Sequence, residues 1–231
     1  MGPDSQVKKV ELGNLHTDVL PEQTREAFSR AVRLDVLPVD EWYLAGGTAL
    51  ALQVGHRSSE DLDFFTEKKN FDTEMLERSL VGAGQWVTTR REQGTLYGIF
   101  HGAKMSCIAY PFFHPSAVHV QCGSLRLLLP DDIAAMKIIA ISQRGRKRDF
   151  VDLYWFTAVH GDFLSDIISR AVSQYPESNH SMPHFLKSLV YFDDAEDDPM
   201  PVIHFKADWE SIEAYFRTEV PKVAEKLLKL R

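Results

Sequence analysis

The stretch YLAGGTALALQVGHRSSEDLDFF, residues 43–65, runs from a short apolar segment through Gly-Gly-Thr to an Asp-Leu-Asp triplet flanked by hydrophobic residues. If the triplet lies in a β-strand, Asp61 and Asp63 point to the same face, because successive side chains of a strand alternate. Two ionised carboxylates this close repel each other unless a cation lies between them. Mg²⁺ is usually held by one or two carboxylates together with substrate phosphates. The triplet is compatible with a strand whose Asp61 and Asp63 side chains bind Mg²⁺, but such a triplet also occurs in glycosyltransferases, phosphatases and many surface turns, so alone it is weak evidence for a metal.

A Gly46-Gly47-Thr48 turn precedes the triplet and lies between a predicted strand and a predicted helix. Glycine lets the backbone approach a phosphate closely, and a helix N-terminus offers free N–H groups and a positive dipole end. Taken alone, the glycines favour a tight strand-to-helix turn. Followed by the Asp pair, the turn favours a site in which one element cradles a triphosphate and the other holds its metal. His56 and Arg57 either add positive charge to that site or belong to a surface turn.

Composition and charge limit the other possibilities. The 231 residues, 44% of them hydrophobic and 26% charged, are typical of a globular protein of one large or two small domains. No apolar run is long enough to span a bilayer, and the N-terminal residues lack the apolar core of a signal peptide, so we expect a cytoplasmic protein without membrane contact. The net charge of −7 means that any contact with RNA or DNA needs a local basic patch. Cys107 and Cys122 suit neither a disulfide scaffold nor a zinc site and are expected to be buried.

The order of the predicted elements indicates an α+β (mixed α/β) fold. Helices and strands alternate in residues 1–122, whereas residues 123–231 are predicted to be helical apart from a loop at 176–208. We therefore expect a mixed sheet flanked by helices in the first part and a C-terminal helical domain in the second. Strands are predicted at 42–45, 61–65, 86–90, 95–101 and 105–110, and helices at 21–36, 48–54, 73–81 (capped by Asp72), 131–144, 147–159, 163–175 and 209–230.

A second block, DDIAAMKIIAISQRGRKRDFVDLYWF at residues 131–156, combines a helical apolar stripe with charged side chains. Lys137 lies on the stripe, and a lysine that faces inward needs a partner. It is either a structural lysine whose ammonium reaches the surface or a phosphate-binding lysine. Asp149 and Asp152 share one helical face and are compatible with an ion-pair lock between helices. The basic run at 144–148 is either a solvated turn or a patch that meets nucleic-acid phosphates.

Both blocks resemble signatures of the AbiEii/AbiGii toxin family of nucleotidyltransferases, which belongs to the DNA polymerase β-like superfamily. The segment LVYFDDAEDDPMP, residues 189–201, is similar to a part of one branch of that family, and the resemblance extends from about residue 40 to the end of the chain. It implies a nucleotidyltransferase-type mixed sheet flanked by helices, followed by a helical domain. It also implies transfer of a nucleoside monophosphate from an NTP to an acceptor hydroxyl, with release of pyrophosphate.

The resemblance further implies partners and roles for particular residues. The acceptor is expected to be RNA, including tRNA ends, and the toxin is expected to have an antitoxin partner. Mg²⁺ would be held by Asp61 and Asp63, and Lys137 would contact the phosphates. Asp152, the second Asp of the RDFVDLY segment, would help to place the acceptor or to order the helices. Nucleotide binding is expected at Gly46, Gly47, Thr48, His56, Arg57 and Lys137.

One expected feature of the superfamily is missing from the sequence. Its enzymes usually carry a third carboxylate on a neighbouring strand, and the matching segment AKMSCIAYPFF, residues 103–113, contains no Asp or Glu. Glu60 or Asp152 could substitute, one metal ion could suffice, or catalysis could be lost. The last case predicts a non-catalytic nucleotide- or RNA-binding module on a degenerate nucleotidyltransferase fold. A different Asp-pair enzyme, such as a phosphohydrolase or a glycosyltransferase, is the remaining alternative.

Overall fold

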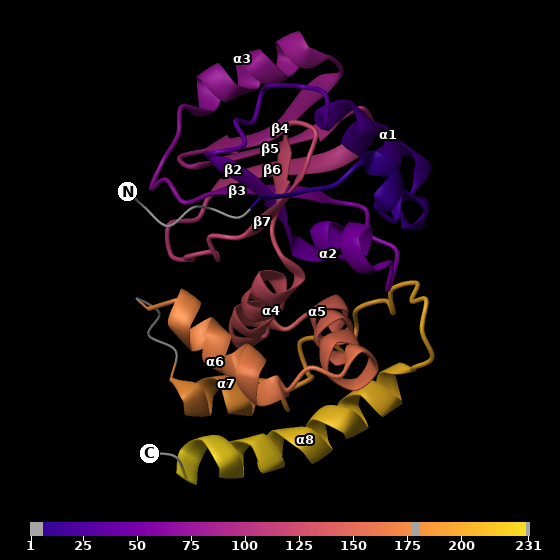
Figure 1. Ribbon diagram of the computed structural model, residues 1–231, viewed down its shortest axis with the longest axis vertical. Helices are drawn as coiled ribbons and strands as arrows, with labels where there is room; N and C mark the ends of the chain where they lie inside the picture. The colour runs from indigo at the N-terminus through magenta and orange to yellow at the C-terminus, as the bar shows by residue number, and fades with distance from the viewer. Residues whose placement is uncertain (1–6, 177–180, 230–231) are drawn as a thin grey trace. The chain divides into compact units, whose positions relative to one another are not determined.

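The computed structural model describes residues 7–176 and 181–229. The chain forms two compact units, Met1–Pro130 and Asp131–Arg231 (Figure 1). The first unit contains the sheet, and the second is helical. The sequence places the boundary at residue 122, but the segment that follows includes a short strand, Leu125–Leu127, which belongs to the sheet. In the described part of the chain, no helix is long and apolar enough to cross a membrane.

One mixed sheet forms the core of the first unit. Its strands are β1 (Val7–Lys9), β2 (Trp42–Ala45), β3 (Leu62–Thr66), β4 (Trp86–Glu92), β5 (Thr95–Phe100), β6 (Ala103–Ala109), β7 (His119–Cys122) and β8 (Leu125–Leu127). They lie in the order β1-β7-β8-β2-β3-β6-β5-β4. The antiparallel pair of β2 and β3 is central, and each of these strands has a parallel neighbour on its other side, β8 and β6 respectively.

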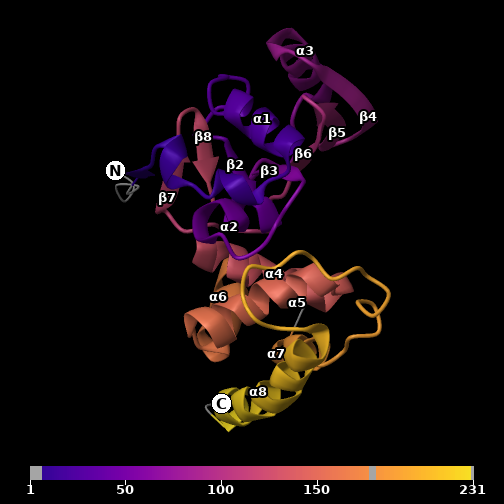
Figure 2. The ribbon, with the colours of Figure 1, turned by 90° about the vertical axis from the view of Figure 1, so that its right-hand side faces the viewer.

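The part of the sheet formed by β3, β6, β5 and β4 has a closed face and an open face. In β3 and β5, buried and partly exposed residues alternate strictly, as expected when one face packs on a core. On the closed face, helix α3 (Thr73–Ala83) packs against β4 and β5 (Figure 2). The Trp86 indole covers Gly98 on that face, where a Cβ would lie 2.3 Å from a ring atom. The open face carries Asp63 and Tyr97, which are partly exposed.

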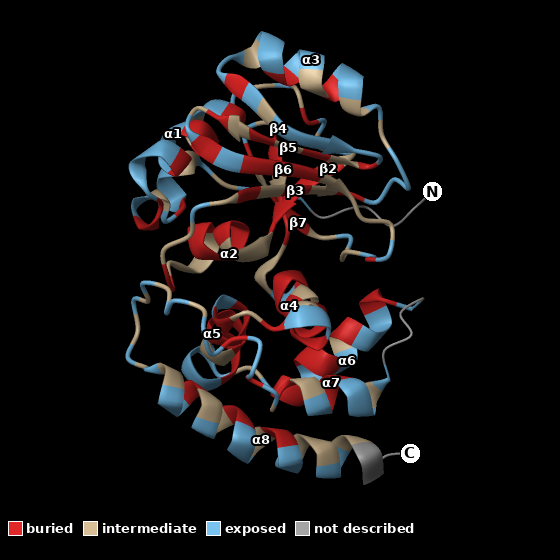
Figure 3. Cartoon of the chain, turned by 180° about the vertical axis from the view of Figure 1, so that it is seen from behind, coloured by how far each residue is buried: buried red, intermediate tan, exposed pale blue. Residues whose placement is uncertain are grey.

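Helices α1 (Glu22–Ala31) and α2 (Gly46–Val54) belong to the same unit. α2 packs against β2 and β3, and residues 48–52 within it are all buried (Figure 3). The helix ends at Gly55, whose φ of +66° is a left-handed conformation that glycine adopts without strain. A helix that is apolar on nearly all sides is expected to be buried in this way.

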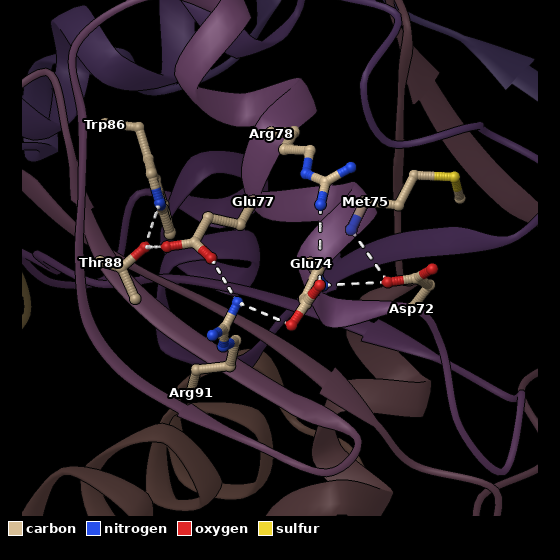
Figure 4. A network of polar contacts seen from close by, with 8 residues as sticks. All are labelled: Asp72, Glu74, Met75, Glu77, Arg78, Trp86, Thr88 and Arg91. Atoms are coloured by element: carbon tan, nitrogen blue, oxygen red, sulfur yellow. Dashed lines mark hydrogen bonds and ion pairs between the residues drawn. The ribbon is translucent and has the colours of Figure 1, made fainter.

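Helix α3 is tied to β4 by a polar network (Figure 4). Its start is capped as the sequence predicts, because the Asp72 carboxylate accepts hydrogen bonds from two N–H groups of the first turn at 3.0 and 2.9 Å. Further along the helix, the Glu77 carboxylate contacts the Thr88 hydroxyl and lies 2.9 Å from Nη1 of Arg91. These contacts fix the position of edge strand β4 from the closed face of the sheet.

The second unit consists of helices around an aromatic centre. Its helices are α4 (Pro130–Arg144), α5 (Lys147–Tyr154), the π-helical segment η3 (Trp155–His160), α6 (Leu164–Gln174), α7 (Met182–Ser188) and α8 (Trp209–Lys229). The ring of Phe150 in α5 packs against the rings of Phe192, Trp209 and Phe216, with centroid distances of 5.0, 5.8 and 5.7 Å. Burial of these rings holds the helices of the unit together.

The α+β class and the helical character of the C-terminal part are confirmed. β2 lies where the sequence predicts it, and β3 begins at Leu62, so that Asp61 lies just before the strand. The sequence does not predict β1, β7 and β8, because three or four residues are too few to show a period. The loop predicted at 176–208 is wrong at α7, a short helix with two buried apolar side chains. Both cysteines are buried and free, as expected.

Candidate functional site

Asp63 lies at the centre of the sheet and faces its open side. In the strand register it stands between Ala45 of β2 and Ser106 of β6. The Ser106 side chain, which is buried, donates a hydrogen bond from Oγ to Oδ1 of Asp63 at 2.6 Å. Asp61, which precedes β3, lines the same pocket as Asp63 and Ser106, with a volume of about 290 Å³. The structure therefore brings the two expected metal ligands together at one pocket of the first unit.

The Gly-Gly turn places the N-terminus of α2 against this carboxylate. α2 begins at Gly46, whose φ of +69° is a left-handed conformation that favours glycine. A Cβ at Gly46 would lie 3.3 Å from Oδ2 of Asp63, and a Cβ at Gly47 would lie 2.1 Å from Nη2 of Arg57. The turn thus contacts a carboxylate on one side and a guanidinium on the other. A helix N-terminus next to a guanidinium attracts anions, so the local chemistry suits phosphate, and a contact with a nucleotide stays a prediction.

Thr48 connects the turn to the loop that carries Asp61. Its side chain is buried, and Oγ1 lies 2.8 Å from Oγ of Ser59 and within hydrogen-bonding distance of the carbonyl oxygen of Asp61. The hydroxyl therefore holds the segment before β3 against the first turn of α2. This contact gives Thr48 a positioning role, whatever part its backbone plays in binding a triphosphate.

His56 and Arg57 lie in the loop between α2 and β3 and are buried rather than exposed. They are 2% and 3% exposed, respectively, which excludes the surface turn that was one of their two interpretations. Nη1 of Arg57 donates to the carbonyl oxygen of Ser58 at 2.8 Å, while Nη2 lies against Gly47. The Arg57 guanidinium is thus held in place next to the helix N-terminus.

Lys137, Asp149 and Asp152 form a buried ionic cluster in the second unit. Nζ of Lys137 lies 2.6 Å from Oδ1 of Asp149 and 2.8 Å from Oδ2 of Asp152, and no side chain of the three is more than 9% exposed. The cluster joins α4 to α5 and has the geometry of an ion-pair lock between helices. A contact of Lys137 with phosphate stays a prediction, as does a role of Asp152 in placing the acceptor.

A hydroxyl occupies the place beside Asp63 where a third carboxylate is expected. Ser106 is the register partner of Asp63 on β6, and that strand carries no acidic residue. Glu60 is exposed and lines a second pocket of about 520 Å³ together with Asp61. Asp152 belongs to the second unit, where its carboxylate is paired with Lys137. Neither of the acids considered as substitutes therefore lies on the strand next to Asp63.

The donors at the pocket fit a magnesium ion whose remaining ligands come from a substrate. Among the residues that the structure describes, no group of three or more His, Cys, Asp or Glu side chains is placed to hold a metal ion. Mg²⁺ keeps several waters and binds through one or two carboxylates plus substrate phosphates. Two carboxylates beside a helix N-terminus are such an incomplete set, and phosphate oxygens and water would complete it.

Several pocket residues are not singled out by the sequence. They are Thr89 of β4, Tyr97 and Ile99 of β5, and Lys104 and Ser106 of β6. The only sequence signal is their alternation along each strand, which places Tyr97 with Ile99 and Lys104 with Ser106 on one face. Alternation does not say which face meets Asp63, because that depends on the register between strands distant in the sequence.

Comparison with known proteins identifies the family. A family described as "Nucleotidyl transferase AbiEii toxin, Type IV TA system" matches residues 31–99 and 116–229. The chain belongs to this family. The matched residues include the Gly-Gly turn, the Asp pair and the Lys137 cluster, so the resemblance found in the sequence is confirmed. An uncharacterized protein of Aquifex aeolicus (strain VF5) is 34% identical to this AbiEii-family chain over 209 residues, which are 89% of this chain and 98% of that protein.

Solved structures share the fold of this AbiEii-family protein. Two structures from Helicobacter pylori, one of them JHP933, are each 20% identical and cover 91% of this chain, with TM-scores of 0.53 and 0.51; the aligned parts are 99% and 96% of those chains. MenT4, a nucleotidyltransferase toxin of Mycobacterium tuberculosis H37Rv, is 14% identical, covers 89% of this chain and 86% of its own, and has a TM-score of 0.51. At these identities the likeness shows the nucleotidyltransferase-type fold.

Proposed function

We propose that this AbiEii-family protein is a Mg²⁺-dependent nucleotidyltransferase that moves a nucleoside monophosphate from an NTP to a hydroxyl of RNA. One observation carries the proposal: the Asp63 carboxylate has Ser106 at Oδ1 and the N-terminal turn of α2 at Oδ2. A partly exposed Asp pair and an anion-attracting helix end therefore meet at one point. An NTP with its metal matches both, since phosphates suit the helix end and the metal suits the carboxylates.

The chemistry needs positioning and charge neutralisation more than covalent help from the protein. The acceptor oxygen forms a bond to the α-phosphorus, the bond from that phosphorus to the pyrophosphate oxygen breaks, and the hydroxyl proton is released. Bound Mg²⁺ supplies charge neutralisation at the phosphates. In this proposal Arg57 and the first turn of α2 hold the triphosphate. Thr48 keeps the Asp61 loop in place, and Ser106 orients Asp63.

The proposal has a second part in the helical unit. Asp152 orders α4 and α5 through its ion pair with Lys137. The proposed contact of Lys137 with substrate phosphates requires its ammonium to leave the buried pair with Asp149 and Asp152. The basic run at 144–148 contributes less to the binding of nucleic-acid phosphates than its charge suggests. Arg146 pairs with Asp198 at 2.6 Å, and the Lys147 ammonium donates to a backbone carbonyl at 3.0 Å. The match to a toxin of a Type IV toxin–antitoxin system supports an antitoxin protein as partner. In this proposal tRNA ends are the candidate acceptors and the setting is cytoplasmic.

A non-catalytic nucleotide- or RNA-binding module is the second candidate. The observation that favours it is the hydroxyl of Ser106 beside Asp63, on a strand without acidic residues. Without a third carboxylate, the pocket has one fewer group that can hold a metal ion or take the proton from the acceptor hydroxyl. Both candidate functions predict that the protein binds NTP, but only the nucleotidyltransferase predicts that it transfers a labelled nucleotide to RNA.

A transfer assay tests the proposal. Wild type, the Asp61→Asn/Asp63→Asn variant and Asp40→Asn are incubated with Mg²⁺, each α-labelled NTP in turn, and total RNA. Asp40 is the matched control, because it is an exposed carboxylate of the same unit that does not line the pocket. We expect label in RNA with wild type and control and none with the double variant. Equal labelling by the double variant would contradict the site, and NTP binding without any transfer by wild type would favour the non-catalytic module.

A further inference from the structure

A row of side chains leads from Asp63 across the open face of the sheet to edge strand β4. Asp63 is paired in register with Ser106 of β6, and Ser106 is paired with Tyr97 of β5. Tyr97 is in turn paired with Arg90 of β4. Residues directly opposite each other in neighbouring strands project to the same face. The row therefore runs without interruption from a predicted metal ligand in β3 across β6 and β5 to the edge strand β4.

The pocket of the Asp pair extends along this row. Besides the carboxylates it is lined by Tyr97, Ile99 and the exposed Lys104. Its volume of about 290 Å³ is just below the usual range for small-molecule sites. An aromatic ring and an aliphatic side chain next to an ammonium suit a flat base that carries a phosphate.

A β-bulge shapes the outer end of the row. The register between β4 and β5 shifts between Thr88 and Arg90, so Thr89 is an extra residue, and it lines the pocket. Bulges next to functional sites re-aim side chains. Arg90 Cζ lies 6.0 Å from the centroid of the Tyr97 ring, within range of a cation–π contact. Its other partner is Glu92 at 2.6 Å, an exposed pair that a phosphate can replace because such pairs contribute little.

The neighbouring residue Arg91, rather than Arg90, attaches strand β4 to helix α3. Arg91 is paired in register with Leu96, on the closed face, and its Nη1 lies 2.9 Å from Glu77 and 3.7 Å from Glu74 of α3 (Figure 4). Arg91 therefore holds the edge strand to α3. Arg90, one residue earlier, points to the opposite face, where it stands over Tyr97 and beside the pocket.

We infer that the acceptor strip, Arg90, Tyr97, Lys104 and Ser106, binds the terminal nucleotide of a single-stranded RNA end. The base stacks on Tyr97, the adjoining phosphate meets Arg90 and Lys104, and the terminal hydroxyl is directed along the row toward the Asp pair. The inference rests on the proposed function, which it extends by naming where the acceptor binds. Stacking on an aromatic ring tolerates every base, so the strip selects an unpaired end rather than a sequence.

Direct binding of RNA tests the strip without depending on catalysis. The probe is a short single-stranded RNA with a fluorescent label at one end and a free terminal hydroxyl at the other, followed by anisotropy without NTP. We expect Tyr97→Ala to weaken binding about 10-fold, and Tyr97→Phe, which keeps the ring, to bind nearly as wild type. Arg90→Ala should weaken binding and reduce its salt dependence. Arg78→Ala is the charge-matched control, since that side chain is on α3 and 83% exposed.

NTP affinity, measured separately, distinguishes the strip from the nucleotide site. It should be unchanged in Arg90→Ala, because Arg90 lies neither on the Gly-Gly turn nor in the lining of the pocket of the Asp pair. The inference would be overturned if wild type bound no RNA, or if Tyr97→Ala bound RNA as tightly as wild type. It would also be overturned if Arg90→Ala lost as much affinity for NTP as for RNA, or if label were transferred only to a protein acceptor. The proposed function fails separately, if wild type binds the RNA normally but transfers label to no acceptor.

Discussion

The protein contains two carboxylate pairs that are similar in sequence and opposite in environment. Asp61 and Asp63 are partly exposed at a pocket, whereas Asp149 and Asp152 are buried and share the ammonium of Lys137. Buried carboxylates need a countercharge within the protein, because their desolvation is costly. A partly exposed pair can receive its countercharge from solution. The burial of the carboxylates, rather than the spacing of the aspartates, distinguishes the two pairs: the buried pair is neutralised by Lys137, whereas the partly exposed pair lines a pocket that an ion from solution can enter.

Removal of the internal cation should have the largest effect. Lys137→Met keeps the apolar stem and leaves two buried carboxylates without their ammonium. We expect the free energy of unfolding to fall by about 3–5 kcal/mol, measured by urea denaturation. A loss below about 1 kcal/mol, the range of exposed ion pairs, would contradict the buried lock.

A rescue variant separates the structural role of Lys137 from its proposed contact with phosphate. In Lys137→Met/Asp149→Asn/Asp152→Asn the whole cluster is neutral, so most of the lost stability should return. Transfer activity should nevertheless stay low if Lys137 contacts the substrate. Full recovery of transfer together with stability would show that the cluster only joins α4 to α5.

Asp63→Asn is the corresponding change at the open pair. Asparagine keeps the size of the side chain and the oxygen that accepts from Ser106, and it loses the charge. We expect kcat/KM for transfer to fall about 10²- to 10³-fold. The free energy of unfolding should fall by less than in Lys137→Met, because Asp63 is partly exposed whereas the Lys137 cluster is buried. A large loss of stability with unchanged transfer would show that Asp63, like Asp149 and Asp152, has a structural role, and would contradict the proposed difference between the two carboxylate pairs.

Gly47→Ala tests the closeness of the α2 turn to the Arg57 guanidinium. The added Cβ would lie 2.1 Å from Nη2 of Arg57, so the side chain must move. We expect a loss of stability of about 1–3 kcal/mol, typical of overpacking, together with weaker NTP binding. Gly82→Ala is the control, because its Cβ would meet no atom within 4 Å and lies within a helix, where alanine is favoured. Equal effects of the two substitutions would contradict the close approach.

Ser106→Ala should have a smaller effect on transfer than Asp63→Asn. It removes the hydroxyl that donates to Oδ1 of Asp63 and should reduce stability by about 1 kcal/mol. Transfer should fall about 10-fold, as expected when a partner that orients a metal ligand is lost. Ser106→Thr keeps the hydroxyl and should retain most of the activity. Similar kinetics of the alanine variant and wild type would show that Asp63 needs no orientation by β6.

Features that depend on neighbouring residues in the chain could be predicted from the sequence. β2, the first turn of α2 and the Asp72 cap of α3 follow from short patterns of apolar, glycine and acidic residues. The shared pocket of Asp61 and Asp63 agrees with the alternation expected in a strand, although Asp61 lies just before β3. For the same reason the family signatures could be recognised, since they are contiguous segments that include these patterns.

Features that depend on distant pairing could not be predicted. Ser106 lies beside Asp63 because β3 and β6 pair, although the two residues are 43 positions apart in the sequence. The Lys137 ammonium meets two carboxylates of the next helix, a choice that the helical pattern leaves open. Likewise, the burial of His56 and Arg57 follows from packing of the loop against α2 and β3, and polar residues in a loop show no such signal.

Binding of NTP with and without Mg²⁺ is the measurement that tests the central claim most directly. The claim is that the open pair and the first turn of α2 form one site for a metal and a triphosphate. Wild type should bind NTP much more tightly when Mg²⁺ is present, and Asp61→Asn/Asp63→Asn should lose that increment while unfolding at the same temperature. Equal binding with and without Mg²⁺, or an undiminished increment in the variant, would contradict the claim.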